Sequence, residues 1–152
     1  MSVLVVDDDD FCGGILARRA QNEGFATHLV LSGAEALEAL REDAFSLRPW
    51  DAMLLDCDLG DMSGFDLLST IRSHFPWTSK MRVVLVSSAA SATHLHSPDA
   101  RQLMRARPRL LPAGNELSCS WDECAALGVE DFWQKPVCAE MLQRLRANMG
   151  IG

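Results

Sequence analysis

Short apolar segments that alternate with helical patterns constrain the fold of this chain more than any other feature of its sequence. The apolar segments are rich in valine and leucine without polar alternation, which is typical of strands covered on both faces. Three of the helical stretches close on Gly24, Pro76 or Gly128. The expected strands are residues 3–6, 27–31, 52–55, 82–86 and 131–134, and the expected helices are residues 11–23, 33–42, 65–74, a stretch near 121–127, and 137–149.

This alternation predicts an α/β fold: a single doubly wound, five-stranded parallel sheet with helices on both faces. At 152 residues, with 48% hydrophobic content, the chain has enough apolar material for one domain spanning 1–152. Segment 91–118 is longer than a minimal connection requires. We therefore expect it to be an insertion within the domain, between the fourth strand and the fourth helix.

Composition excludes several classes of function. A formal net charge of −7 argues against nonspecific binding to nucleic acid, which depends on Lys and Arg contacts to phosphates. The five cysteines lack C-x-x-C spacing, which argues against a zinc site and favours reduced thiols. The apolar N-terminal run is too short for a signal peptide or a membrane span. We expect a cytoplasmic protein that binds neither membrane nor nucleic acid directly.

Carboxylates follow two of the expected strands at the point where each strand ends. Asp7 and Asp8 come directly after residues 3–6, and Asp56 follows residues 52–55. The carboxyl ends of parallel strands meet at one edge of a sheet, where ligands bind, so these three side chains should lie close together. Three carboxylates repel one another unless a hard cation binds, and Mg²⁺ prefers oxygen ligands. The sequence therefore predicts a magnesium site.

Two further polar residues are expected at the same edge of the sheet. Ser87 ends the fourth strand and supplies a hydroxyl, while Lys135 ends the fifth and supplies a positive charge. A carboxylate that attacks phosphorus needs its charge neutralised and the transferring oxygens held, which a metal, a lysine and a hydroxyl provide. The predicted chemistry is formation of an aspartyl phosphate.

The order of these motifs resembles the receiver domains of two-component response regulators, the CheY-like receivers with a flavodoxin-like fold. The resemblance is carried by Val-Leu-Val-Val-Asp-Asp, Leu-Ser-Gly-Ala-Glu-Ala-Leu, Leu-Leu-Asp with a following Asp-Met-Ser-Gly, Val-Leu-Val-Ser-Ser, and Lys-Pro. It covers almost the whole chain. It implies the following roles: Asp56 as phosphoacceptor, Asp7 and Asp8 as Mg²⁺ ligands, Asp58 as a ligand through its backbone carbonyl, Ser87 as switch hydroxyl, Lys135 as phosphate-sensing lysine, and Phe132 as the aromatic residue that swings inward.

By this resemblance the chain is a phosphoryl-accepting signalling switch and not an enzyme with its own substrate. A histidine kinase or a histidine phosphotransfer protein would donate phosphate to Asp56, and an unknown downstream protein would recognise the result. The signalling face would comprise the fourth helix, fifth strand and fifth helix. A homodimer that forms through this face is a further option. The chain would be either a stand-alone receiver or a fragment of a larger regulator or hybrid kinase.

Two other functions remain open. A degenerate receiver would keep the fold and act only as a protein-binding module. A phosphatase of the haloacid dehalogenase type would use Asp56-Cys57-Asp58 as its D-x-D motif, although in that family the acidic pair follows the motif rather than preceding it as Asp7 and Asp8 do. Sustained turnover of a phosphate monoester would identify the phosphatase.

Departures from the family pattern lead to further expectations. Ser87 and Lys135 are 48 positions apart, about twice the usual family separation, which places the insertion beside the switch loop. Gly60 stands where the family commonly has proline, so we expect a looser loop after Asp56. Asp9 and Asp10 are expected to be loop residues or N-caps of the first helix rather than metal ligands, and Cys57 is expected to face the core.

Overall fold

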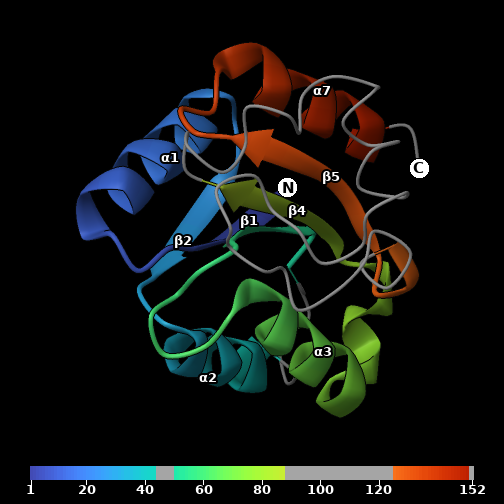
Figure 1. The fold of residues 1–152 in the computed structure, drawn as a ribbon. Coiled ribbons are helices and arrows are strands. Elements are labelled where there is room, and N and C mark those ends of the chain that lie inside the picture. Colours follow the sequence, from blue (N-terminus) through green and yellow to red (C-terminus); the bar gives the residue numbers. More distant parts are fainter. Residues whose placement is uncertain (44–49, 88–124, 151–152) are drawn as a thin grey trace, which may run out of the picture.

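The fold is a single parallel sheet with helices on both faces (Figure 1). The computed structural model describes residues 1–43, 50–87 and 125–150. All strand pairs are parallel, in the spatial order β2-β1-β3-β4-β5. The predicted fold class is therefore confirmed. The strands are β1 (Ser2–Val6), β2 (Ala26–Val30), β3 (Ala52–Asp56), β4 (Arg82–Ser87) and β5 (Val129–Gln134).

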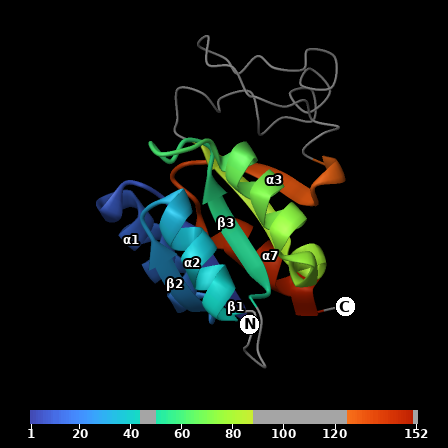
Figure 2. The same cartoon turned by 90° about the horizontal axis from the view of Figure 1, so that it is seen from below.

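The helices divide into two layers, one on each face of the sheet. Figures 1 and 2 show α2 (Gly33–Asp43) and α3 (Gly64–His74) together on one side, whereas α1 (Asp10–Asn22) and α7 (Ala139–Gly150) cover the other. A short 3-10 helix, η1 (Pro76–Lys80), connects α3 to β4. Successive residues of a strand point to opposite faces, so each central strand contributes to both hydrophobic layers.

Strand β1 illustrates this division. Leu4 and Val6 pack in the layer under α2 and α3, and Val3 and Val5 pack in the layer under α1 and α7. All four side chains are buried. A strand that is buried on both faces needs an unbroken apolar run, which is why β1 lacks alternation.

Strand β2 differs from this expectation. It lies at the edge of the sheet, and only Val30, its last residue, is buried. Ala26 and His28 are exposed. The prediction that all five strands are covered on both faces is wrong for β2, because an edge strand receives less cover from the helices.

The helix boundaries agree with the sequence prediction to within about two residues. Asp9 caps α1, as predicted, since its side chain accepts hydrogen bonds from the amides of Phe11 (3.0 Å) and Cys12 (3.2 Å). Cys57 packs against the layer under α2 and α3, as predicted. The insertion 91–118 and most of the expected helix near 121–127 lie outside the described residues. Within the part of the chain that is described, no helix is both long and apolar enough to cross a membrane.

Candidate phosphoryl-acceptor site

Three carboxylates meet at the carboxyl edge of the sheet. Asp7 and Asp8 follow β1, Asp56 ends β3, and one ligand atom from each lies within 4.8 Å of the other two. Asp7 is buried, Asp56 is partly buried and Asp8 is exposed. The cluster is thus open to solvent on the Asp8 side. The strand order explains the proximity, because β1 and β3 are adjacent in the sheet.

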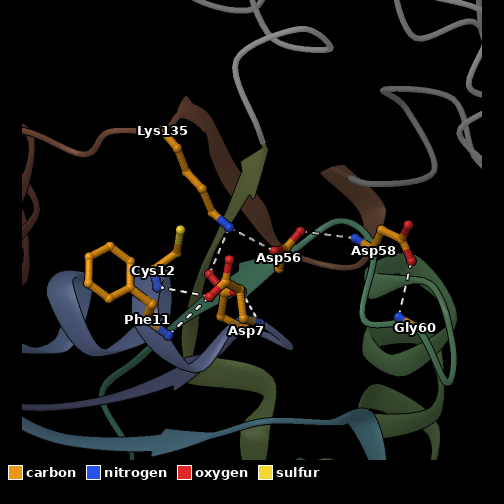
Figure 3. Close-up of polar contacts among 8 residues, drawn as sticks. Asp7, Phe11, Cys12, Asp56, Asp58, Gly60 and Lys135 are labelled. Carbon is orange, nitrogen blue, oxygen red and sulfur yellow. Dashed lines mark hydrogen bonds and ion pairs between the residues drawn. The ribbon is translucent and has the colours of Figure 1, made fainter.

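Lys135 bridges two of these carboxylates (Figure 3). Its ammonium nitrogen Nζ lies 2.7 Å from Oδ2 of Asp7 and 2.9 Å from Oδ2 of Asp56. The Lys135 amide donates a hydrogen bond of 2.9 Å to the carbonyl of Ser87, and a cis peptide bond joins Lys135 to Pro136. The ends of β4 and β5 therefore deliver a positive charge to the acidic cluster.

Burial and the neighbouring charges alter the acidity of Asp56. Burial raises the pKa of Asp56 to about 6, against the opposing effects of the hydrogen bonds from Lys135 and the Asp58 amide. The nearby carboxylate of Asp7 adds to the increase. For Lys135, burial acts to lower the pKa, but the hydrogen bonds that its ammonium donates to Asp56 and Asp7 outweigh this effect and the pKa is raised. Lys135 is therefore a permanent cation at physiological pH.

Ser87 and Phe132 lie on β4 and β5, the two strands whose ends lead to Lys135. Ser87 is buried, with 3% of its surface exposed, and it ends the strand next to β3. Phe132 pairs in register with Leu85 and is buried in the hydrophobic layer under α2 and α3. The Phe132 side chain is therefore part of the core, with 1% of the residue exposed. The switch roles of Ser87 and Phe132 remain predictions.

The loop after Asp56 makes its own hydrogen bonds. The Asp58 amide donates to Oδ1 of Asp56 (3.1 Å), and the Gly60 amide donates to Oδ1 of Asp58 (3.1 Å) (Figure 3). Gly60 has a φ of +79°, which proline cannot adopt, and proline would also lack the amide that binds Asp58. This loop conformation therefore excludes proline and favours glycine at this position; whether the loop is looser than in relatives stays a prediction.

Two residues to which the sequence analysis assigned no role make tertiary hydrogen bonds, Asp61 in the loop after Asp56 and Arg72 near the end of α3. Asp61 accepts hydrogen bonds from the amides of Gly33 (3.1 Å) and Ala34 (3.2 Å) at the start of α2. The guanidinium of Arg72 on α3 donates to three backbone carbonyls beyond its own helix. Both contacts join segments far apart in the chain. Only a local signal, the turn-forming Gly60-Asp61 pair, was visible in the sequence.

A cavity of about 350 Å³ lies next to the cluster, between α1 and the segment after β5. On the nearby surface of α1, Phe11 is 77% exposed and Ile15 is 39% exposed. The rim of the site is therefore apolar on this side. The cavity is lined by Cys12, Ile15, Leu16, Arg19, Lys135, Pro136 and Val137.

Comparisons with known proteins agree with this arrangement. The family model described as the response regulator receiver domain matches residues 3–106. The chain is 35% identical over 89 residues to the hybrid signal transduction histidine kinase L of Dictyostelium discoideum, covering 59% of this chain and 5% of that protein. It is 41% identical over 71 residues to the DNA-binding response regulator MtrA of Mycobacterium tuberculosis, covering 47% of this chain and 29% of that protein. The chain thus spans less than a third of the length of either relative.

Solved structures share the fold. The two component response regulator from Cytophaga hutchinsonii superposes with a TM-score of 0.72 at 21% identity, covering 99% of this chain and 97% of that chain. A CheY-like receiver domain protein from Methanospirillum hungatei superposes with a TM-score of 0.64 at 18% identity, covering 99% of this chain and 94% of that chain. The family match spans more than half of the chain. This protein therefore belongs to the family of response regulator receiver domains of two-component systems.

Proposed function

We propose that this receiver domain accepts a phosphoryl group on Asp56 and signals through altered protein contacts. The observation that carries the proposal is the bridge from Lys135 to Asp7 and Asp56 within a cluster of three carboxylates. A partly buried lysine paired with two acids offsets the charge of the nucleophile and can afterwards bind the oxygens of a transferred phosphoryl group. The raised pKa of Asp56, in contact with a charge partner, is a further property that favours a functional site.

The donor set at this edge fits Mg²⁺. Carboxylate oxygens of Asp7, Asp8 and Asp56 would hold the ion, and the backbone carbonyl of Asp58 would add a further ligand. When bound, Mg²⁺ would offset negative charge on the carboxylates and on the incoming phosphoryl group. The open side at Asp8 leaves room for water or phosphate oxygens. The cofactor we propose is accordingly Mg²⁺.

The transfer itself follows from the position of Asp56. A carboxylate oxygen of Asp56 forms the new P–O bond while the P–N bond of a phosphohistidine breaks, and the electron pair returns to the imidazole nitrogen. Lys135, which contacts Asp56, can then form an ion pair with the oxygens of the transferred phosphoryl group. Ser87, on the neighbouring strand, supplies a hydroxyl on the same edge. Contacts made only in the phosphorylated state shift the population toward the signalling arrangement, with Phe132 held inward.

The donor we propose is a histidine kinase or a histidine phosphotransfer protein. The exposed side chains of Phe11 and Ile15, next to the cavity beside Lys135, offer apolar contact to a protein donor. An apolar surface contributes little to the binding of a small, charged phosphate monoester, which disfavours the phosphatase alternative. A downstream protein, or a second copy of the chain, would then recognise the altered face that includes β5 and α7.

The decisive experiment is intact-protein mass spectrometry after incubation with acetyl phosphate, with and without Mg²⁺. We expect one phosphoryl adduct on the native chain, dependent on Mg²⁺, and none on Asp56→Asn, because asparagine keeps the shape but is not a nucleophile. Circular dichroism would establish that the variant is folded. An adduct that persists in Asp56→Asn would contradict the assignment.

The same experiment separates the alternatives. If the folded native chain stays unlabelled while a known receiver is labelled in parallel, the chain is a degenerate receiver that acts by binding alone. If it releases phosphate continuously from a monoester such as p-nitrophenyl phosphate, with loss of activity in Asp56→Asn, the phosphatase reading is supported. If the chain is labelled on Asp56, phosphotransfer from a phosphorylated histidine domain would identify the class of its natural donor.

Binding of Mg²⁺ should depend on pH in a direction set by Asp56. Because the pKa of Asp56 is raised to about 6, the carboxylate is ionised above that pH and takes up a proton below it. A proton on Asp56 competes with the metal, so the apparent dissociation constant should be roughly tenfold larger at pH 5 than at pH 8. Isothermal titration calorimetry would measure it. In Asp56→Asn, the Mg²⁺ dissociation constant should no longer change near pH 6. A native affinity for Mg²⁺ that is constant between pH 5 and pH 8 would contradict the prediction.

A further inference from the structure

The loop that carries Asp58 is attached to the start of a neighbouring helix. The two carboxylate oxygens of Asp61 accept one hydrogen bond each, Oδ1 from the amide of Gly33 (3.1 Å) and Oδ2 from the amide of Ala34 (3.2 Å). Gly33 and Ala34 are the first two residues of α2. A carboxylate at this position is favoured by the unpaired amides and by the helix dipole. The backbone hydrogen bond from Gly33 is the main cause of a lowered pKa at Asp61, so it is ionised at neutral pH.

Helix α2 also has a cap of its own. The hydroxyl of Ser32 accepts a hydrogen bond from the Glu35 amide (3.0 Å), and the Glu35 carboxylate accepts one from the Leu31 amide (2.7 Å). The Ser32 hydroxyl thus acts as an N-cap for the third amide of α2, and the Glu35 carboxylate ties the first turn to the preceding Leu31. Asp61 accepts from the first two amides of α2, which this cap leaves without a partner. Its contribution is therefore to the loop more than to the helix.

An apolar contact reinforces this attachment. A Cβ atom on Gly33 would lie 2.4 Å from Sδ of Met62, so the side chain next to Asp61 is packed directly on the first residue of α2. Leu59, on the other side of Asp61, is 2% exposed, and its amide donates to the Met62 carbonyl (3.1 Å). Residues 61 and 62 of the loop are thus held on α2 by the hydrogen bonds of Asp61 and by the packing of Met62 on Gly33.

Residues 57 and 58, at the start of the loop, are held next to Asp56. The amide of Asp58 donates to Oδ1 of Asp56 (3.1 Å), and the amide of Gly64 donates to the Cys57 carbonyl (2.8 Å). Asp58 therefore lies between an anchor at Asp56 and an anchor at α2. A loop held at one end alone would have to be ordered when a ligand binds, at a cost in conformational entropy.

We propose that Asp61 is a positioning residue of the metal site, which holds the loop of residues 57–63 by binding the N-terminus of α2 and so keeps Asp58 in place for Mg²⁺. This inference rests on the proposed function, because it concerns the same metal site. Asp61 does not touch the metal ligands in any recorded contact. It acts through the loop, as partners of ligating groups do at other metal sites, where their loss costs about tenfold or more in affinity.

The test is the affinity for Mg²⁺ alone, measured by isothermal titration calorimetry on the full chain. Asp61→Ala loses both hydrogen bonds, and we expect its dissociation constant to rise about tenfold. Asp61→Asn loses the same charge but keeps one acceptor oxygen, so it should lie between the native chain and Asp61→Ala. The difference between the two variants therefore measures the attachment rather than the charge.

Ser32→Ala is the matched control. It removes a cap from the same helix and should lower the melting temperature about as much as Asp61→Ala, by a few degrees. The hydrogen bonds of Ser32 go to the amides of Glu35 and Ala36 within α2, so the Mg²⁺ affinity of Ser32→Ala should equal that of the native chain. Equal losses of affinity in Ser32→Ala and Asp61→Ala would overturn the proposal, since the effect would then belong to α2.

The remaining outcomes separate this inference from the proposed function. If the native chain binds Mg²⁺ and Asp61→Ala binds it equally well, the positioning role is wrong and the phosphoryl-accepting site stands. If the folded native chain does not bind Mg²⁺ at millimolar concentration, the metal site itself is wrong, and the role of Asp61 is overturned with it.

Discussion

Replacing Gly64 by alanine should destabilise the fold by about 3 kcal/mol or more and displace the proposed phosphoacceptor. Gly64 begins α3 where the helix passes against the end of β3. A Cβ atom there would lie 2.4 Å from the carbonyl oxygen of Asp56 and 3.2 Å from the Cα of Cys57. Both contacts are with backbone, which cannot rotate away. Urea denaturation of the two proteins would measure the difference in the free energy of unfolding.

Gly14→Ala is a matched control for this substitution. Gly14 lies inside α1, and a Cβ atom built on it meets nothing within 4 Å. Alanine should therefore stabilise the protein by roughly 0.5–1 kcal/mol, because it is a better helix former than glycine. A Gly64→Ala protein as stable as the native chain, with unchanged Mg²⁺ affinity, would show that α3 can shift without disturbing Asp56.

Replacing Arg72 by methionine should cost about 3 kcal/mol of stability. The Arg72 guanidinium donates hydrogen bonds to the carbonyls of Leu127 (2.8 Å), Met81 (2.9 Å) and Thr78. These contacts join α3 to η1, to the start of β4 and to the segment before β5. Methionine keeps much of the apolar stem but leaves the three carbonyls without this donor. Chemical denaturation, followed by circular dichroism, would measure the loss.

Arg41→Met provides the comparison on the surface. The ion pair of Arg41 with Glu38 (3.0 Å) has both side chains more than half exposed, at 66% and 61%. Exposed pairs of this kind contribute little, so the change should stay within about 0.5 kcal/mol. If Arg72→Met were equally mild, the three carbonyls would have to find water in place of the guanidinium.

The sequence was sufficient to predict the sheet and the carboxylate cluster, because both depend on local signals. Unbroken apolar runs identify buried strands, and an acidic residue directly after such a run marks the carboxyl end. Asp7, Asp8 and Asp56 could be placed together because parallel strands end at one edge. Asp9 could be recognised as a cap because its position before a helical pattern is itself local.

Contacts between distant segments could not be predicted in the same way. The bridge from Lys135 to Asp7 and Asp56 depends on the register of β5 against β4. The attachment of Asp61 to α2 spans 28 positions, and that of Arg72 to Leu127 spans 55. Each of these contacts depends on the position in which a helix packs on the sheet, and residue types alone do not specify that position. The exposure of β2 was missed for the same reason, since a short apolar run does not show whether its strand lies at an edge.

The lysine between the two aspartates has a consequence for how the protein exists in the cell before any signal arrives. An acidic cluster without a counter-ion would make the folded state depend on the supply of a divalent cation. Lys135 provides a counter-ion that is encoded in the chain, with Nζ 2.7 Å from Asp7 and 2.9 Å from Asp56. We therefore expect the domain to fold without a divalent cation. Under the proposed function, changes in free Mg²⁺ would alter the extent of phosphorylation while the fraction of folded protein stays constant.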